Sequence, residues 1–235
     1  MTTTSNIYLI PSFLHEGATH TIPGYILPAV KDSEVFFVEN ERSARRYLKT
    51  MWKEMVIDDY SWVTIHKAEA AVQASFRNYI REGKNIGIIS EAGCPGVADP
   101  GQLLVQVAHD AGALVKPLVG PSSILLALMG SGMNGQEFSF IGYLPIDAGQ
   151  RVKYIRELET MSARRNSTQI FIETPYRNNQ LMEVLLKFCQ PNTRLCVAAD
   201  LTAETEFIQT KKIADWKKQV PDLHKRPTIF CLLSV

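Results

Sequence analysis

The chain has 235 residues, of which 46% are hydrophobic and 21% are charged. This composition is typical of a globular protein with a substantial core, and a formal net charge of +1 excludes a strong global field for a polyanionic partner. No apolar run approaches the roughly 18–20 residues needed to cross a bilayer, so we expect a cytoplasmic protein without membrane contact.

The first half alternates short apolar runs with helical patterns. The apolar runs, bounded by turn residues, are 7–10, 35–38, 63–65, 86–89 and 114–119. Apolar residues at three-to-four spacing predict helices over 41–55, 68–82 and 102–111, followed by a further helix over 121–129. This alternation predicts a mostly parallel sheet whose strands are buried on both faces.

The second half has a different rhythm. Loop residues over 131–136 interrupt the pattern, and we expect the domain boundary there, between an N-terminal α/β domain (1–132) and a C-terminal α/β domain (133–235). The predicted strands are 138–141, 169–172, 194–198, 206–210 and 228–233, with helices near 151–161 and 178–189. The short link 200–205 cannot hold a crossover helix, so it predicts an antiparallel hairpin and a mixed sheet.

Two loops follow predicted strands of the first half. The segment S-E-A-G-C-P-G-V-A-D-P-G (90–101) leads into a helix, and V-G-P-S-S (119–123) does the same. Ligands of open α/β sheets bind beyond the carboxyl ends of strands, where glycine permits close approach to the main chain. The simpler interpretation of 90–101 is a rigid turn with Asp99 as a helix N-cap. The simpler interpretation of 119–123 is that its serines only cap the next helix.

Several common sites have no sequence signal. The chain lacks a phosphate-binding P-loop, a dinucleotide-binding G-x-G-x-x-G and a G-x-S-x-G nucleophile elbow. Its four cysteines form no C-x-x-C pair and its five histidines are scattered, so we expect buried, reduced thiols and no metal site.

The motifs together resemble the tetrapyrrole methylase superfamily, and within it the branch of ribosomal RNA small subunit methyltransferase I. The loop 90–101 is similar to that branch's S-D-A-G-x-P-x-x-S-D-P-G, and 119–123 to its P-G-P-S-A helix start. The segments F-S-F-I-G-Y-L-P (138–145) and E-T-P-Y-R (173–177) look like its F-x-F-x-G-F-L-P and E-S-P-H-R. The resemblance covers nearly the whole chain.

This resemblance implies a two-domain fold, a homodimer and S-adenosylmethionine bound in a cleft between the domains. Residue by residue, it implies the following cofactor-binding set: Pro11, Glu91, Ala92, Gly93, Cys94, Pro95, Ser122, Ser123, Ile124, Ile172 and Ala199. The departures from the family pattern lie on the substrate side, in P-S-F-L-H-E-G (11–17), E-N-E-R (39–42) and A-D-L-T-A (199–203).

Methyl transfer needs mainly alignment of donor and acceptor, but a ribose hydroxyl must also lose its proton. Glu39, Arg42 and Arg177 are the candidate catalytic residues, and a plain salt-bridge role is the alternative for each. The basic runs 42–53, 151–165 and 211–218 are candidates for phosphate contacts.

The leading hypothesis is therefore an S-adenosylmethionine-dependent methyltransferase acting on a ribose 2'-hydroxyl of small-subunit ribosomal RNA. The alternatives are a methyltransferase for a tetrapyrrole or another small molecule, and a non-catalytic module that binds S-adenosylmethionine.

Overall fold

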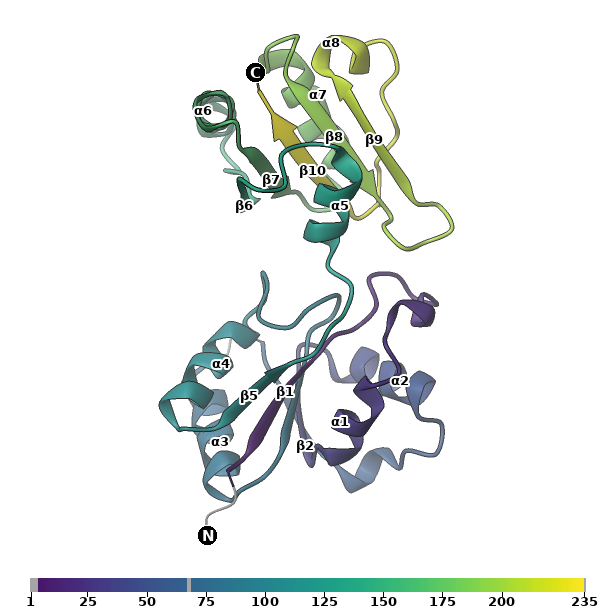
Figure 1. Cartoon of the computed structure of the whole chain (residues 1–235), viewed down its shortest axis with the longest axis vertical. Helices are drawn as coiled ribbons and strands as arrows, with labels where there is room; N and C mark the ends of the chain where they lie inside the picture. Colours follow the sequence, from purple (N-terminus) through teal and green to yellow (C-terminus); the bar gives the residue numbers. More distant parts are fainter. Residues whose placement is uncertain (1–3, 67–68, 235) are drawn as a thin grey trace. The chain divides into compact units, whose positions relative to one another are not determined.

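The structure is a computed structural model that describes residues 4–66 and 69–234. It divides into two compact units, Met1–Ser122 and Ser123–Val235, and each unit has its own five-stranded sheet (Figure 1). No helix in the described ranges is long and apolar enough to span a membrane.

The sheet of the first unit is parallel throughout, which confirms the prediction. Its strands are β1 (Asn6–Ile10), β2 (Val35–Val38), β3 (Ser61–Thr64), β4 (Ile86–Ile89) and β5 (Leu114–Pro117). The spatial order is β3-β2-β4-β1-β5, so β1 pairs with both β4 and β5.

Helices cover both faces of this sheet because side chains alternate along each strand. The helices are α1 (Ile26–Asp32), α2 (Glu41–Met51), α3 (Ala70–Arg81) and α4 (Gly101–Asp110), with short 3-10 turns at Thr19–Thr21 and Ile57–Asp59. Tyr8 and Ile10 of β1 pack with α1 and α2 in one core cluster. Ile7 packs with α3 and α4 on the other face. The predicted start of α3 at Ala68 lies outside the described residues.

The expectation that all five strands are buried is wrong for the edge strand β3, none of whose residues is buried, and for β5. β5 also lies at an edge of the sheet, and Leu114 is 53% exposed. An edge strand has a neighbouring strand on one side only and is therefore more exposed to solvent than a central strand. The apolar sequence of β5 did not distinguish these two positions. By contrast, every residue of β2 and β4 is buried, as expected.

The second unit has the predicted mixed sheet. Its strands are β6 (Phe138–Tyr143), β7 (Thr168–Ile172), β8 (Arg194–Ala199), β9 (Phe207–Lys212) and β10 (Thr228–Leu233), in the order β6-β7-β10-β8-β9. β6 and β7 are parallel, whereas β10 is antiparallel to β7 and β8. β8 and β9 form the predicted antiparallel hairpin.

One face of the second sheet is covered by three helices: α6 (Ala148–Arg165), α7 (Asn178–Phe188) and α8 (Ile213–Trp216). Helix α5 (Ser123–Ser131) packs against β8, β9 and β10. A side chain at Gly130 of α5 would lie 3.0 Å from Ile208, and Thr210 donates a hydrogen bond to the carbonyl of Ser131 at 2.8 Å. Ile208 pairs with Ala198, whose side chain points away from the three-helix core.

These α5 contacts explain why the units divide at Ser122/Ser123, ten residues before the boundary expected between 132 and 133. The loop residues at 131–136 lie inside the second unit, where they connect α5 to β6.

Candidate functional site

The candidate site lies at the carboxyl edge of the first sheet. β1 and β4 are neighbours there, with Ile10 opposite Ile89. The chain leaves β1 toward helices on one face and leaves β4 toward α4 on the other face. Connections that diverge in this way form a topological switch point, where open α/β sheets bind ligands.

The loops after β1 and β4 are joined by an isolated antiparallel bridge. The amide of Ser12 donates to the carbonyl of Gly93 at 2.9 Å, and the amide of Gly93 donates to the carbonyl of Ser12 at 3.2 Å. The hydroxyl of Ser12 also donates to the carbonyl of Ser90 at 3.1 Å. This buried serine therefore fixes the start and the middle of the predicted cofactor loop.

The loop after β5 closes against the same two loops. A side chain on Gly120 would place its Cβ 2.1 Å from Cβ of Pro11, so this position requires glycine. The thiol of Cys94 lies 3.5 Å from the carbonyl of Pro121 and 3.7 Å from that of Gly120. Burial raises the pKa of this thiol, so Cys94 stays protonated and can donate to these carbonyls.

The loop 90–101 turns through left-handed backbone at Gly93, Gly96 and Ala98, with φ values of 77°, 82° and 60°. The carboxylate of Asp99 accepts from the amide of Gly96 at 2.9 Å and from that of Gly101 at 2.7 Å. Burial raises the pKa of Asp99, and these two hydrogen bonds oppose the rise. Asp99 thus accepts a hydrogen bond from the first amide of α4, which is similar to the N-cap role considered above. The N-cap position itself is occupied by Pro100.

Glu39, a candidate catalytic residue, contacts the main chain of this loop. Its Oε2 accepts from the amide of Glu91 at 2.5 Å. Burial is the main factor that raises the pKa of Glu39; the carboxylates of Asp99 and Glu91 raise it further, and the hydrogen bond lowers it. Arg42 lies in the first turn of α2, where its side chain is exposed.

Two tyrosines that the sequence analysis did not select also hold the site. The hydroxyl of Tyr47 on α2 donates to the carbonyl of Pro11 at 2.5 Å, and burial raises the pKa of Tyr47 far above its usual value. The hydroxyl of Tyr25 accepts from the amide of Val119 at 2.6 Å. The apolar spacing of α2 placed Tyr47 on the core side, but nothing in that spacing indicated its partner.

In the second unit, Ile172 and Ala199 end β7 and β8 at the same edge of the sheet, on either side of β10. Ile172 pairs with Ile229, whereas Ala199 pairs with Thr228, so their side chains point to opposite faces. Ala199 is fully buried in the core beneath α7 and α8. Its side chain is therefore not available to a ligand.

Arg177, the third catalytic candidate, is bound to Glu173. Its Nη2 and Nε donate to Oε1 of Glu173 at 2.7 and 3.0 Å, and the amide of Thr174 donates to the same oxygen at 2.7 Å. Glu173 is only 6% exposed. The structure thus gives Arg177 the salt-bridge role that was the plainer alternative.

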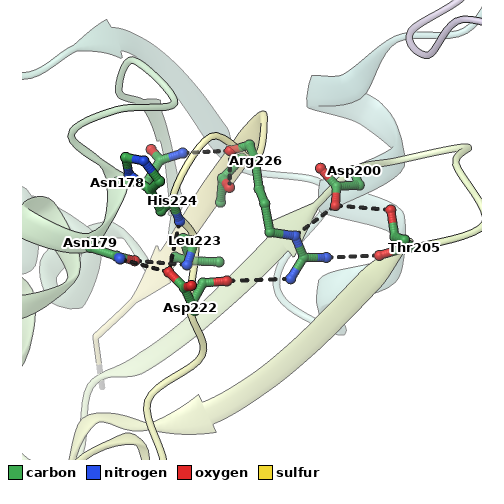
Figure 2. Close-up of polar contacts among 9 residues, drawn as sticks. Asn178, Asn179, Asp200, Thr205, Asp222, Leu223, His224 and Arg226 are labelled. Atoms are coloured by element: carbon green, nitrogen blue, oxygen red, sulfur yellow. Dashed lines mark hydrogen bonds and ion pairs between the residues drawn. The ribbon is translucent and has the colours of Figure 1, made fainter.

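A polar network that includes Asp200 and Arg226 lies just after the end of β8 (Figure 2). Nε of Arg226 donates to Asp200 at 2.6 Å, and Nη2 donates to the carbonyl of Thr205 at 2.8 Å. Both ends of the β8–β9 loop are therefore held by one guanidinium. Asp200 and Thr202 of this loop have left-handed φ values of 52° and 73°. Such conformations are unfavourable for residues with a side chain and persist where surrounding contacts fix them.

The first unit therefore brings together Pro11, the loop residues 91–95 and Ser122 within three adjacent connections. Ser123 and Ile124 begin α5 and belong to the second unit with Ile172 and Ala199.

The main chain of the cofactor loop can accept a ligand. Among the described residues, the amides of Ala92 and Cys94 make no hydrogen bond, whereas the amides of Glu91, Gly93 and Gly96 do. Ala92 is exposed and has the smallest side chain after glycine. Two available N–H donors beside a small side chain fit a polar organic ligand such as S-adenosylmethionine.

Other features of the described residues lie away from this arrangement. A cavity of about 580 Å³ at the opposite edge of the first sheet has Arg77, Arg81 and Asp110 in its lining, and none of the three loops contributes to it. No group of three or more histidine, cysteine, aspartate or glutamate side chains is placed to hold a metal ion in the part of the chain that the structure describes.

The sequence is similar to one protein family and to several curated proteins. The sequence model of the family described as Tetrapyrrole (Corrin/Porphyrin) Methylases matches residues 26–216. A protein named Ribosomal RNA small subunit methyltransferase I from Mesorhizobium japonicum is 34% identical over 131 residues, which are 56% of this chain and 43% of that protein. The protein of the same name from Vibrio cholerae is 34% identical over 133 residues, 57% of this chain and 45% of that protein. Each match thus spans less than half of the relative's length.

Among solved structures, that of the methyltransferase CobJ has a TM-score of 0.64 and 16% sequence identity. The similarity covers 99% of this chain and 94% of that one. It confirms the predicted fold, with a parallel N-terminal sheet and a mixed C-terminal sheet.

Proposed function

The chain belongs to the tetrapyrrole methylase family, whose members are S-adenosylmethionine-dependent methyltransferases, and we propose that it catalyses methyl transfer from this donor. The observation that carries the proposal is the joining of three strand-to-helix loops at the switch point of the first sheet. The Ser12–Gly93 bridge and the contact between Cys94 and Pro121 hold these loops together and leave main-chain donors available.

We assign donor binding first to the loop residues 91–95, with Pro11 and Ser122 beside them. When bound, S-adenosylmethionine supplies an electrophilic methyl group on a sulfonium. Transfer from a sulfonium requires alignment of the reacting atoms rather than strong acid catalysis. The hydrogen bonds of Tyr47 and Ser12 keep the protein side of the site rigid, because they fix the carbonyl of Pro11 and the residue that follows it.

Four further residues remain predicted parts of the donor site, and they are Ser123, Ile124, Ile172 and Ala199. For Ala199 the prediction cannot involve the side chain, because that side chain is buried in the core of the second unit.

We propose RNA as the acceptor, at a ribose 2'-hydroxyl of small-subunit ribosomal RNA. The names of the relatives at 34% identity support this choice. Of the basic side chains in the three runs, Arg45, Arg46, Lys49, Arg151 and Lys218 are bound to groups of the protein itself. In the described ranges, Arg42, Arg164, Lys212 and Lys217 make no side-chain hydrogen bond or ion pair and are the better candidates for phosphate contacts.

Among the three catalytic candidates, Arg42 is favoured. Glu39 and Arg177 are already engaged with the main chain and with Glu173, whereas the exposed guanidinium of Arg42 is available. A cation at this position can stabilise the negative charge that develops on an attacking hydroxyl oxygen. A homodimer and a cytoplasmic location complete the proposal, and light scattering of the purified protein tests the former.

Two measurements test the proposed function. Titration calorimetry with S-adenosylmethionine tests donor binding. A protein that does not bind the donor would refute the proposal. Incubation with labelled S-adenosylmethionine and small ribosomal subunits, followed by mapping of the modified nucleotide, tests the acceptor. Donor binding with transfer to a tetrapyrrole but not to RNA would replace the acceptor, and donor binding without any transfer would indicate a binding module.

A further inference from the structure

We propose that Glu39 is a positioning residue of the donor site, which acts on the ligand through the main chain of the loop 90–101. This inference rests on the proposed function. Glu39 follows β2, the strand next to β4 in the sheet. Its carboxylate therefore reaches the loop from a neighbouring strand end and lies outside the loop that it holds.

Glu39 holds the beginning of the loop from two sides. Its amide donates to the carbonyl of Ile89 at 3.3 Å, and its carboxylate accepts from the amide of Glu91 at 2.5 Å. Glu39 is therefore hydrogen-bonded to the last residue of β4 and to the second residue of the loop. The middle of the loop is fixed by the bridge from Ser12, and its far end by Asp99.

The contact favours a positioning role for Glu39 over the catalytic role considered for it above. One carboxylate oxygen of Glu39, Oε2, already accepts a hydrogen bond from the amide of Glu91. The charged groups that face Glu39 are the carboxylates of Glu91 and Asp99, and in the described part of the chain no cation forms an ion pair with Glu39. Its charge is therefore stabilised mainly by the loop amide.

Because the pKa of Glu39 is raised, this anchor is sensitive to acidification. A carboxylate accepts a stronger hydrogen bond than a neutral acid or an amide does. The anchor is complete above the raised pKa and weakens as pH falls through it. Donor affinity should therefore fall on acidification at a higher pH than an ordinary glutamate would give.

The test measures calorimetric affinity for S-adenosylmethionine and S-adenosylhomocysteine from pH 8 to pH 5, in the wild type and in Glu39→Gln, Glu39→Ala and Glu41→Gln. We expect Glu39→Ala to weaken both ligands by about tenfold or more, as for loss of a hydrogen bond to a charged group. Glu39→Gln should weaken both by a few-fold at pH 8 and lose the acid-dependent part of the wild-type profile. Glu41→Gln is the matched control, because Glu41 is paired with Arg45 on the helix surface.

S-adenosylmethionine carries a positive charge on sulfur, and S-adenosylhomocysteine does not. A comparison of their affinities therefore distinguishes positioning of the loop from a direct contact between the Glu39 charge and the ligand. A loss confined to S-adenosylmethionine would overturn the proposal, because it would place the Glu39 charge against the ligand. Identical pH profiles for the wild type and Glu39→Gln would also overturn it, even if Glu39→Ala failed to fold. If the wild type bound neither ligand, the proposed function itself would fail.

Discussion

Gly120 offers the sharpest test of how the three loops form one site. Replacement by alanine places a Cβ 2.1 Å from Cβ and 2.4 Å from Cγ of Pro11. Carbon atoms pack at about 3.5–4.0 Å, so the loop after β5 must move by roughly 1.4 Å or more. Pro11 has little freedom to yield, because Tyr47 holds its carbonyl. Overpacking of this kind costs about 1–3 kcal/mol of unfolding free energy.

The expected result for Gly120→Ala is a lower urea midpoint with an unchanged slope, and donor affinity reduced at least tenfold by calorimetry. Gly24→Ala is the control in the same unit, because a Cβ there meets no atom within 4 Å. If both variants had the same stability and affinity, the contact between the loops after β1 and β5 would have no role in the site.

Three further predictions concern the second unit. Ser123→Trp should weaken donor binding by about tenfold or more in a folded protein, because the bulky ring would obstruct the start of α5; unchanged calorimetric affinity would remove Ser123 from the site. Arg226→Ala should lower the unfolding free energy by about 2–3 kcal/mol in urea titrations, because the largely buried Asp200 loses its cation; a loss under about 0.5 kcal/mol would contradict this. Lys217→Gln should reduce the salt slope of RNA binding by about one, whereas Lys218→Gln should change it less because Lys218 is already paired; equal slopes would exclude Lys217 from the RNA surface.

Much of the architecture could be predicted from the sequence because it depends on local pattern. The fully buried strands β2 and β4 coincide with their apolar runs, since a central parallel strand needs apolar side chains on both faces. Helix α1 was missed because Pro28 interrupts its apolar spacing. Proline is tolerated in the first turn of a helix, where its amide is not needed, so Pro28 marks the beginning of α1 rather than a break.

Features that depend on tertiary contacts could not be predicted. The unit to which α5 belongs is decided by Gly130 packing on Ile208, a contact between residues far apart in the sequence. The inward direction of Ala199 follows from the register of β8 with β10. For the site, the loops were identified from their glycines and prolines, but the roles of Ser12 and Tyr47 depend on which carbonyl each hydroxyl reaches.

The bridge between Ser12 and Gly93 joins residues roughly 80 positions apart, and the strands on which it depends pair in parallel. Contacts of such sequence separation form late, because a long segment of chain must be ordered before they contribute. Ligand recognition in this protein should consequently emerge with the completed first unit during synthesis. A peptide that contains the loop 90–101 alone should have no measurable affinity, however closely its sequence follows the family motif.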